Sequence, residues 1–250
     1  MLTTVVIGAV ATILGGIAQR TSGIGFALVA TPLFVLVLGP LESIVVVNLC
    51  AAFSATLVTA QVWCSVKWRR YLPLAIGGLL CIPLGVLTAT SVDEAILQCI
   101  VGAIMIVALV TPLMFRRLRI DGQPDSVAFL SGGAAGYLNA VAGVGGPALT
   151  AFALVTNWDH AEFRATVQPI FVTIGVGSVI AKVLLGGGTY AAPDLLLLAV
   201  MAGTTVIGIV VGGLLARVIP SRIARVLVIC IALAGGIVIL LEGIVDLATR

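Results

Sequence analysis

Long stretches without any charged side chain constrain this chain more than any other feature. Only 9% of its 250 residues are charged, whereas a soluble globular domain usually carries about 25%. The charges stand in clusters, and the segments between them are uncharged and apolar: 43–66, 71–92, 95–115, 126–158, 165–181, 195–216 and 226–241. A helix needs roughly 20 apolar residues to cross the hydrocarbon core of a bilayer. The pattern predicts an all-α, multi-pass membrane protein with no sizeable soluble domain.

The chain also repeats itself at a spacing of 120 residues. The matched pairs are Gly16 with Gly136, Gln19 with Asn139, Gly23 with Gly143, Gly25 with Gly145, Glu42 with Glu162, Asn48 with Gln168 and Pro73 with Pro193. Chance in a sequence rich in Gly and Val explains single pairs but hardly this collinear series. We therefore predict one integrated transmembrane domain that consists of two duplicated repeats, residues 1–118 and 119–250.

Each repeat begins with a long apolar segment that polar residues and glycines interrupt. The two segments are GGIAQRTSGIGFALVATP and GYLNAVAGVGGPALTAF, and three helix-length runs follow each of them. Such a segment suits a broken or re-entrant pair of short helices, because irregular backbone at membrane depth is tolerated only where protein shields it or where it lines a cavity. Paired breaks at corresponding positions of two repeats indicate the binding site of a transporter.

The positive charges predict how the repeats are oriented. If each interrupted segment returns to its starting side, the stretches 67–70, 116–125, 156–164 and 217–225 share one side and carry ten Lys and Arg residues, against two on the other side. If each segment crosses once, the division is eight to four. The positive-inside rule favours the first arrangement. We predict inverted repeats with both termini outside, although the crossing arrangement stays open at this point.

Arg20 is the only charged residue among residues 1–41. The polar and glycine residues around it are Gln19, Thr21, Ser22, Gly23 and Gly25. A guanidinium beside hydroxyls and free amides at a helix start suits an oxyanion. We expect Arg20 to face Asn139 and the amides of residues 143–146 across a shared cavity. The alternative is that Arg20 extends to the level of the lipid headgroups.

The remaining candidates for the substrate site come from the second break and from the two helices that follow the breaks. Gly143, Gly145 and Gly146 offer backbone amides, and the alternative role for these glycines is close helix packing. Asn48 and Gln168 occupy matched positions in the helices after the breaks. They either complete the site from both repeats or form hydrogen bonds between helices.

Several function classes find no support in the sequence. The five cysteines are scattered singly and there is one histidine, whereas metal and redox sites need clustered ligands. We expect no metal, no cofactor, no enzymatic activity and no nucleic-acid partner. The chain has no nucleotide-binding P-loop motif, so we expect that transport would draw on a proton or sodium gradient, or on the gradient of the substrate itself.

These residues make the chain similar to a known family, the TauE/SafE sulfite exporters of bacterial and plant membranes. The features that carry the likeness are the break at Gly16, Gly23 and Gly25, its echo at 139–147, the helix start at Pro73, and the glycine-rich segments 208–216 and 232–240. The resemblance implies a secondary transporter in the cytoplasmic membrane that moves sulfite, a sulfonate or a related organosulfur acid by alternating access. The alternatives are a carrier for a small carboxylate or a neutral solute, and a membrane scaffold without transport.

Overall fold

A computed structural model describes residues 2–114, 118–120, 122, 124–186, 194–218 and 221–249. Every regular element within these ranges is a helix. The elements are α1 (Leu2–Ser22), α2 (Phe26–Val62), the 3-10 turn η1 (Trp63–Ser65), α3 (Trp68–Ser91), α4 (Glu94–Met114), α5 (Asp125–Ala142), α6 (Gly146–Val155), α7 (His160–Leu185), α8 (Leu195–Leu215) and α9 (Ser221–Ala248). In these ranges, seven helical segments are long and apolar enough to cross a membrane. The prediction of an all-helical membrane protein is confirmed.

A break at Gly39 divides α2 into a short arm, residues 26–38, and a long helix, residues 40–62. Gly39 has φ 75° and ψ 170°, a conformation that is essentially restricted to glycine, and Pro40 suits the first turn of the helix that follows. At 1.5 Å per residue the arm is roughly 20 Å long, and α6, with 10 residues, is about 15 Å long. Neither reaches across a hydrocarbon core of about 30 Å. We call α1 with the arm the first hairpin, and α5 with α6 the second hairpin.

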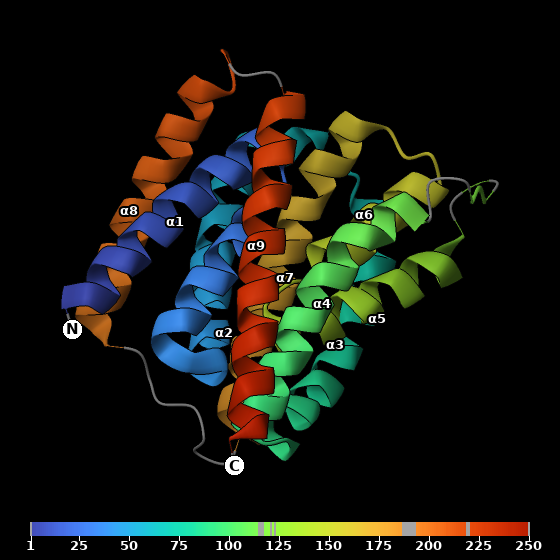
Figure 1. The fold of residues 1–250 in the computed structure, drawn as a ribbon. Coiled ribbons are helices and arrows are strands. Elements are labelled where there is room, and N and C mark those ends of the chain that lie inside the picture. The colour runs from blue at the N-terminus through green and yellow to red at the C-terminus, as the bar shows by residue number, and fades with distance from the viewer. Residues whose placement is uncertain are drawn as a thin grey trace.

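Each half of the chain packs mainly against the other half. α1 lies along α8 and α5 along α3, while α2 packs on α7 and α4 on α9 (Figure 1). Glycines let the first two pairs approach closely, because the backbone at Gly16 meets that at Gly208, and the backbone at Gly136 meets that at Gly78. Small residues have this role in membrane helix pairs. The halves thus form one bundle, and the repeat boundary at residues 118 and 119 stays a prediction.

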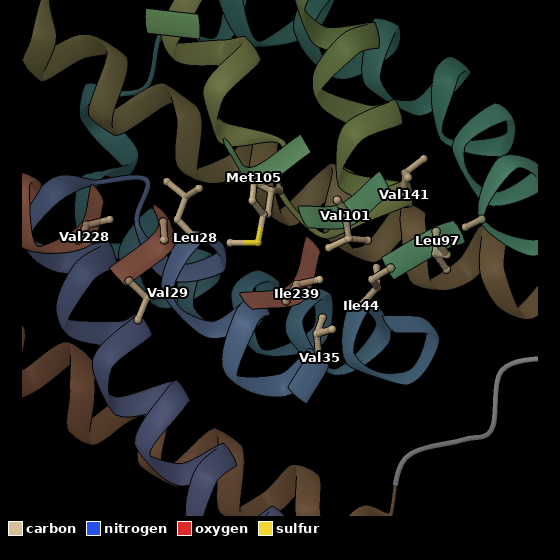
Figure 2. Packing of buried hydrophobic residues seen from close by; sticks show 14 of the residues in the cluster. Leu28, Val29, Val35, Ile44, Leu97, Val101, Met105, Val141, Val228 and Ile239 are labelled. Carbon is tan, nitrogen blue, oxygen red and sulfur yellow. The ribbon is translucent and has the colours of Figure 1, made fainter. Parts of the chain in front are cut away.

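A cluster of buried apolar side chains joins α2, α4, α5 and α9 (Figure 2). Its members include Leu28, Val29, Val35, Ile44, Leu97, Val101, Met105, Val141, Val228 and Ile239. Three of these belong to the short arm of α2, which cannot anchor itself across the membrane. The cluster therefore fixes the first hairpin against helices from both halves of the chain.

Basic side chains gather at one end of the bundle, which we call the basic end. Lys67 and Arg70, at the start of α3, form ion pairs with Glu162, at the start of α7, over 3.0 and 3.2 Å. Arg119 Nη1 donates to Asn157 Oδ1 at 3.2 Å, shortly before α7 begins. Described residues from three of the four basic stretches therefore meet here, while Arg116 and Arg117 lie outside the described residues.

The described residues of the fourth basic stretch, 217–218 and 221–225, follow α8 at the same end. Arg20, in the last turn of α1, packs against Gly212 and Gly213 near the end of α8. Since α1 ends and α9 begins at the basic end, the first residues of α1 and the last of α9 lie at the opposite end (Figure 1). This is the arrangement that the ten-to-two charge division favours, while the orientation in the membrane stays a prediction.

Candidate functional site

The tips of the two hairpins have the same backbone conformation. Gly23 has φ +88° and Gly143 has φ +71°, left-handed values that glycine adopts without strain. The same hydrogen bond closes each tip, since Gly23 N donates to Gln19 O and Gly143 N donates to Asn139 O, both at 2.8 Å. The residues of each pair are 120 positions apart. The duplication seen in the sequence thus extends to the backbone geometry of the tips.

The next glycine after each tip is needed because a side chain would collide with its neighbours, and not because its backbone conformation requires glycine. Gly25 and Gly145 have φ −90° and −89°, which any residue adopts. A Cβ at Gly25 would lie 2.7 Å from the Cβ of Ala18, and one at Gly145 would lie 2.7 Å from the carbonyl oxygen of Ala135. At Gly146 the nearest atom would be 3.6 Å away. Close packing, one of the two roles that the sequence left open, therefore applies to Gly25 and Gly145.

This difference between neighbours predicts a difference in stability. Gly145→Ala is expected to lower the melting temperature of the detergent-solubilised protein, because overpacking costs about 1–3 kcal/mol. Gly146→Ala is expected to leave the melting temperature unchanged, since its methyl group finds room. Thermal unfolding followed by circular dichroism measures both values. Equal melting temperatures for the two variants would contradict the assignment.

Two hydrogen-bonded amide pairs join the halves at matched positions. Gln19 Nε2 donates to Gln168 Oε1 at 2.7 Å, and Asn139 Nδ2 donates to Asn48 Oδ1 at 2.8 Å. The spacing of 120 residues relates Gln19 to Asn139 and Asn48 to Gln168. Each pair therefore connects the hairpin of one half to the long helix of the other half. All four side chains are buried.

Between the hairpin tips lies a small cavity of about 20 Å³, which we call the central chamber. The candidate site residues that line it are Gln19, Asn48, Asn139, Gly143, Gly145 and Gly146. Phe171 and Gly175 of α7 complete one wall. A water molecule needs roughly 10–15 Å³ of such volume. As described by the structure, the chamber has room for a water molecule and is too small for an ion of the size of sulfite.

The central chamber offers hydrogen-bond donors. Asn48 Nδ2 is buried and has no hydrogen-bond partner among the described residues, and an unpaired buried amide costs about 1–3 kcal/mol. Phe26 and Gly146, the first residues of α2 and α6, also line the chamber. Two helix N-termini, which carry partial positive charge, thus meet beside the unpaired donor. The chamber is suited to a ligand that carries negative charge.

A larger cavity of about 620 Å³ opens at the basic end, and we call it the vestibule. The ends of α1 and α2 and the start of α7 form its walls, and exposed residues such as Cys64 and Ala161 form its rim. The candidate site residues that line it are Gln19, Arg20, Gly23 and Gln168. Gln19 lines both cavities, so its bond to Gln168 separates the vestibule from the central chamber.

Arg164, which the sequence places within a charged loop, joins Arg20 and Lys67 as a basic residue of the vestibule lining. Its Nη2 donates to the carbonyl oxygen of Arg20 at 3.1 Å. Its side chain covers the first hairpin tip, because a Cβ at Gly23 would lie 3.0 Å from Arg164 Nε. Arg164 precedes Gln168 by one helical turn and so shares its face of α7. That spacing is the sequence signal for Arg164.

The structure corrects the expected position of Arg20. Arg20 lines the vestibule and Asn139 lines the central chamber, so they do not face each other across one cavity. The backbone is still helical at these residues, and successive side chains therefore point about 100° apart. Gln19 points toward Gln168, whereas Arg20 lies along α8, with its Nε 3.6 Å from a Cβ built on Gly213. Gln19 occupies the place that we expected for Arg20.

Thr21 and Ser22 do not line the vestibule or the central chamber. Their hydroxyls donate to carbonyl oxygens of their own helix, Thr21 Oγ1 to Ile17 O at 2.8 Å and Ser22 Oγ to Ala18 O at 2.7 Å. Ser and Thr commonly bond back to the preceding turn in this way. Their expected role as ligands for an oxyanion has no support in this state.

Comparison with known proteins places the chain in a family. The family model described as "Sulfite exporter TauE/SafE" matches residues 7–239, which confirms the resemblance seen in the sequence. Searches of curated proteins and of solved structures gave no match. The family is one of membrane transporters and not of enzymes. Because the match covers nearly the whole chain, this protein belongs to the TauE/SafE sulfite exporter family.

Proposed function

We propose that this chain is a secondary transporter that moves sulfite, a sulfonate or a related organosulfur acid across the cell membrane by alternating access. One observation carries the proposal. Asn48 Nδ2 is buried without a hydrogen-bond partner among the described residues, in a chamber where two helix N-termini meet. Helix N-termini at a break in the membrane are suited to anionic substrates. The family to which the chain belongs supports the same class of substrate.

The two amide pairs serve as the gates in the proposed cycle. The pair Gln19–Gln168 closes the chamber toward the vestibule. The pair Asn48–Asn139 closes it toward the other end, where Asn139 Nδ2 also donates to Ser178 Oγ at 3.1 Å. Both pairs are formed in this structure, and we therefore assign it to the occluded state of the proposed cycle. An anion that enters from the vestibule breaks the first pair and replaces its hydrogen bonds with bonds to substrate oxygens.

Inverted repeats are part of the proposal, and the direction of α2 and α7 supports them. The two helices run antiparallel. Gly175, in the second half of α7, lies close to the Asn48 carbonyl, 3.2 Å from a Cβ built there. Near the start of α7, Thr166 Oγ1 accepts a hydrogen bond at 3.0 Å from the backbone N of Lys67, beyond the end of α2. Equivalent helices of inverted repeats run in opposite directions through the membrane.

The basic end faces the cytoplasm in this proposal, because positively charged loops remain on that side. The vestibule then opens to the cytoplasm, and Arg20 and Arg164 attract the anion to its mouth. A substrate that is to be exported enters through it and leaves at the opposite end.

Flux into proteoliposomes tests the proposal. Purified protein is reconstituted, and uptake of sulfite, methanesulfonate, acetate and a neutral solute is compared with uptake by protein-free vesicles. We expect flux of sulfite or of the sulfonate above the control, and imposed proton or sodium gradients identify the coupling ion. Flux of acetate alone would favour a carrier for small carboxylates. Absence of flux for every solute would overturn the proposal.

A further inference from the structure

Lys182 is a buried charged residue that the proposed cycle does not use. Its side chain is 1% exposed, whereas Val183 and Leu184 are 72% and 74% exposed. A lysine near the end of a membrane helix usually extends to the interface. Here the lysine points into the protein while its apolar neighbours face outward. Because a charged group within the membrane is costly, an inward-facing lysine marks a candidate functional site.

Lys182 is the last member of a polar row along one face of α7. The other members are Arg164, Gln168 and Ser178, which follow each other at spacings that a helix of 3.6 residues per turn places within about 40° of one direction. Arg164 and Gln168 line the vestibule, and Ser178 accepts a hydrogen bond from Asn139. The row therefore begins at the vestibule, passes both gates and ends at Lys182.

The duplication relates the far end of this row, Ser178 and Lys182, to residues of the first half. The spacing of 120 residues relates Val58 and Val62, which line the vestibule, to Ser178 and Lys182. The same spacing relates the gate toward the vestibule to the gate on the other side. Val62 lies on the vestibule side of the Gln19–Gln168 gate. By the same relation, Lys182 lies on the far side of the Asn48–Asn139 gate.

The basic groups of the vestibule have no counterpart at their own equivalent positions. Arg20 corresponds to Ala140, Lys67 to Gly187, and Arg164 to Ile44. The spacing of 120 residues relates each residue of the vestibule lining to a residue in the other half. Among those related residues, the basic one is Lys182. Basic residues thus lie beside both gates, but they occupy positions that the spacing of 120 residues does not relate to each other.

We infer that Lys182 binds the anion in a second vestibule, which forms at the end opposite the basic end when the Asn48–Asn139 gate opens. The inference rests on the proposed function, and its ligand is the same small anion. In the present state the gate is closed and protein covers the ammonium group. Once the gate opens, Lys182 holds the anion on that face as Arg20 and Arg164 do in the vestibule.

Apparent affinity measured on each face of the membrane tests this inference. Under the proposed orientation, right-side-out membrane vesicles present the Lys182 end to the medium, and inverted vesicles present the basic end. Lys182→Met is expected to raise the KM for sulfite about tenfold or more in right-side-out vesicles, because a charge-assisted hydrogen bond is lost. In inverted vesicles the KM is expected to stay within about twofold of wild type. Methionine keeps the side-chain volume, and removal of a buried charge is compatible with folding.

Two further variants complete the design. Arg20→Met is the matched control and is expected to raise the KM in inverted vesicles only. Lys182→Arg keeps the charge and is expected to restore part of the affinity that Lys182→Met loses. If Lys182→Met changes the KM on neither face and only lowers the melting temperature, the lysine merely stabilises the C-terminal end of α7 and the inference is overturned. Wild-type vesicles without anion flux would instead overturn the proposed function itself.

Discussion

Asn48→Asp is expected to abolish anion transport. The substitution keeps the size of the side chain and the Oδ1 atom that accepts from Asn139, but it replaces the unpaired donor Nδ2 with a carboxylate oxygen. Two like charges about 4 Å apart repel by roughly 4 kcal/mol at an effective dielectric constant of 20, which is close to a thousandfold in affinity. Sulfite flux in proteoliposomes measures the loss.

Gln61→Glu is the matched control for this prediction. It makes the same amide-to-acid change on the same helix, at an exposed position outside the lining of either cavity. Its flux is expected to remain close to that of the wild type. Size-exclusion profiles of both variants establish that the bundle is folded. Unchanged KM and rate for sulfite in a folded Asn48→Asp protein would remove the central chamber from the proposed pathway.

Gly143→Val is expected to eliminate most transport, whereas Gly143→Asn is expected to retain much of it. The space around Gly143 is ordinary, because a Cβ would lie 3.4 Å from Thr31 Oγ1. The obstacle is the φ of +71°, which costs a side chain about 1–2 kcal/mol and which a β-branched residue tolerates worst. Asparagine accepts left-handed values more readily. Valine is therefore expected to change the hairpin tip and displace Asn139 from its gate.

Gly122 offers a control for the backbone strain that a side chain introduces at a positive φ. Gly122 has φ +75°, no atom of the described residues lies within 4 Å of a Cβ built on it, and it is not among the residues that line the two cavities. Gly122→Val introduces the same strain away from the hairpins and is expected to leave sulfite flux unchanged. Equal flux in the Gly143→Val and Gly122→Val proteins would show that the conformation of the tip is unimportant.

The duplication in the sequence indicates which polar residues of the two halves are equivalent, while their role in binding stays a prediction. The repeats predict that Asn48 and Asn139 line one space, and the two side chains form a hydrogen bond. Their equivalents at the spacing of 120 residues, Gln168 and Gln19, form the equivalent bond. A collinear repeat fixes which residues are equivalent, and equivalent residues meet equivalent partners when the two halves pack on each other.

Side-chain direction was not predictable to the same degree. Periodicity fixes the angle between Gln19 and Arg20, but it does not say which of the two faces the other half of the chain. Arg164 was hidden among loop charges, since helix boundaries within a charged cluster give no signal of burial. Lys182 was counted among the loop charges for the same reason. Only the packing of α7 shows that it points inward.

Because helices of the first half pack against helices of the second half, the order of synthesis determines when these contacts can form. α1 leaves the ribosome first, yet the nearest neighbours of Gly16 belong to α8, whose last residue is Leu215. At about 5–20 residues per second, the interval between the two is roughly 10 to 40 s. The contact between α3 and α5 likewise forms only after α5 has been synthesised. Until then the nascent first half exposes its closest-packing surfaces to lipid or to the insertion machinery, and truncated chains that lack α8 should be substrates for membrane quality control.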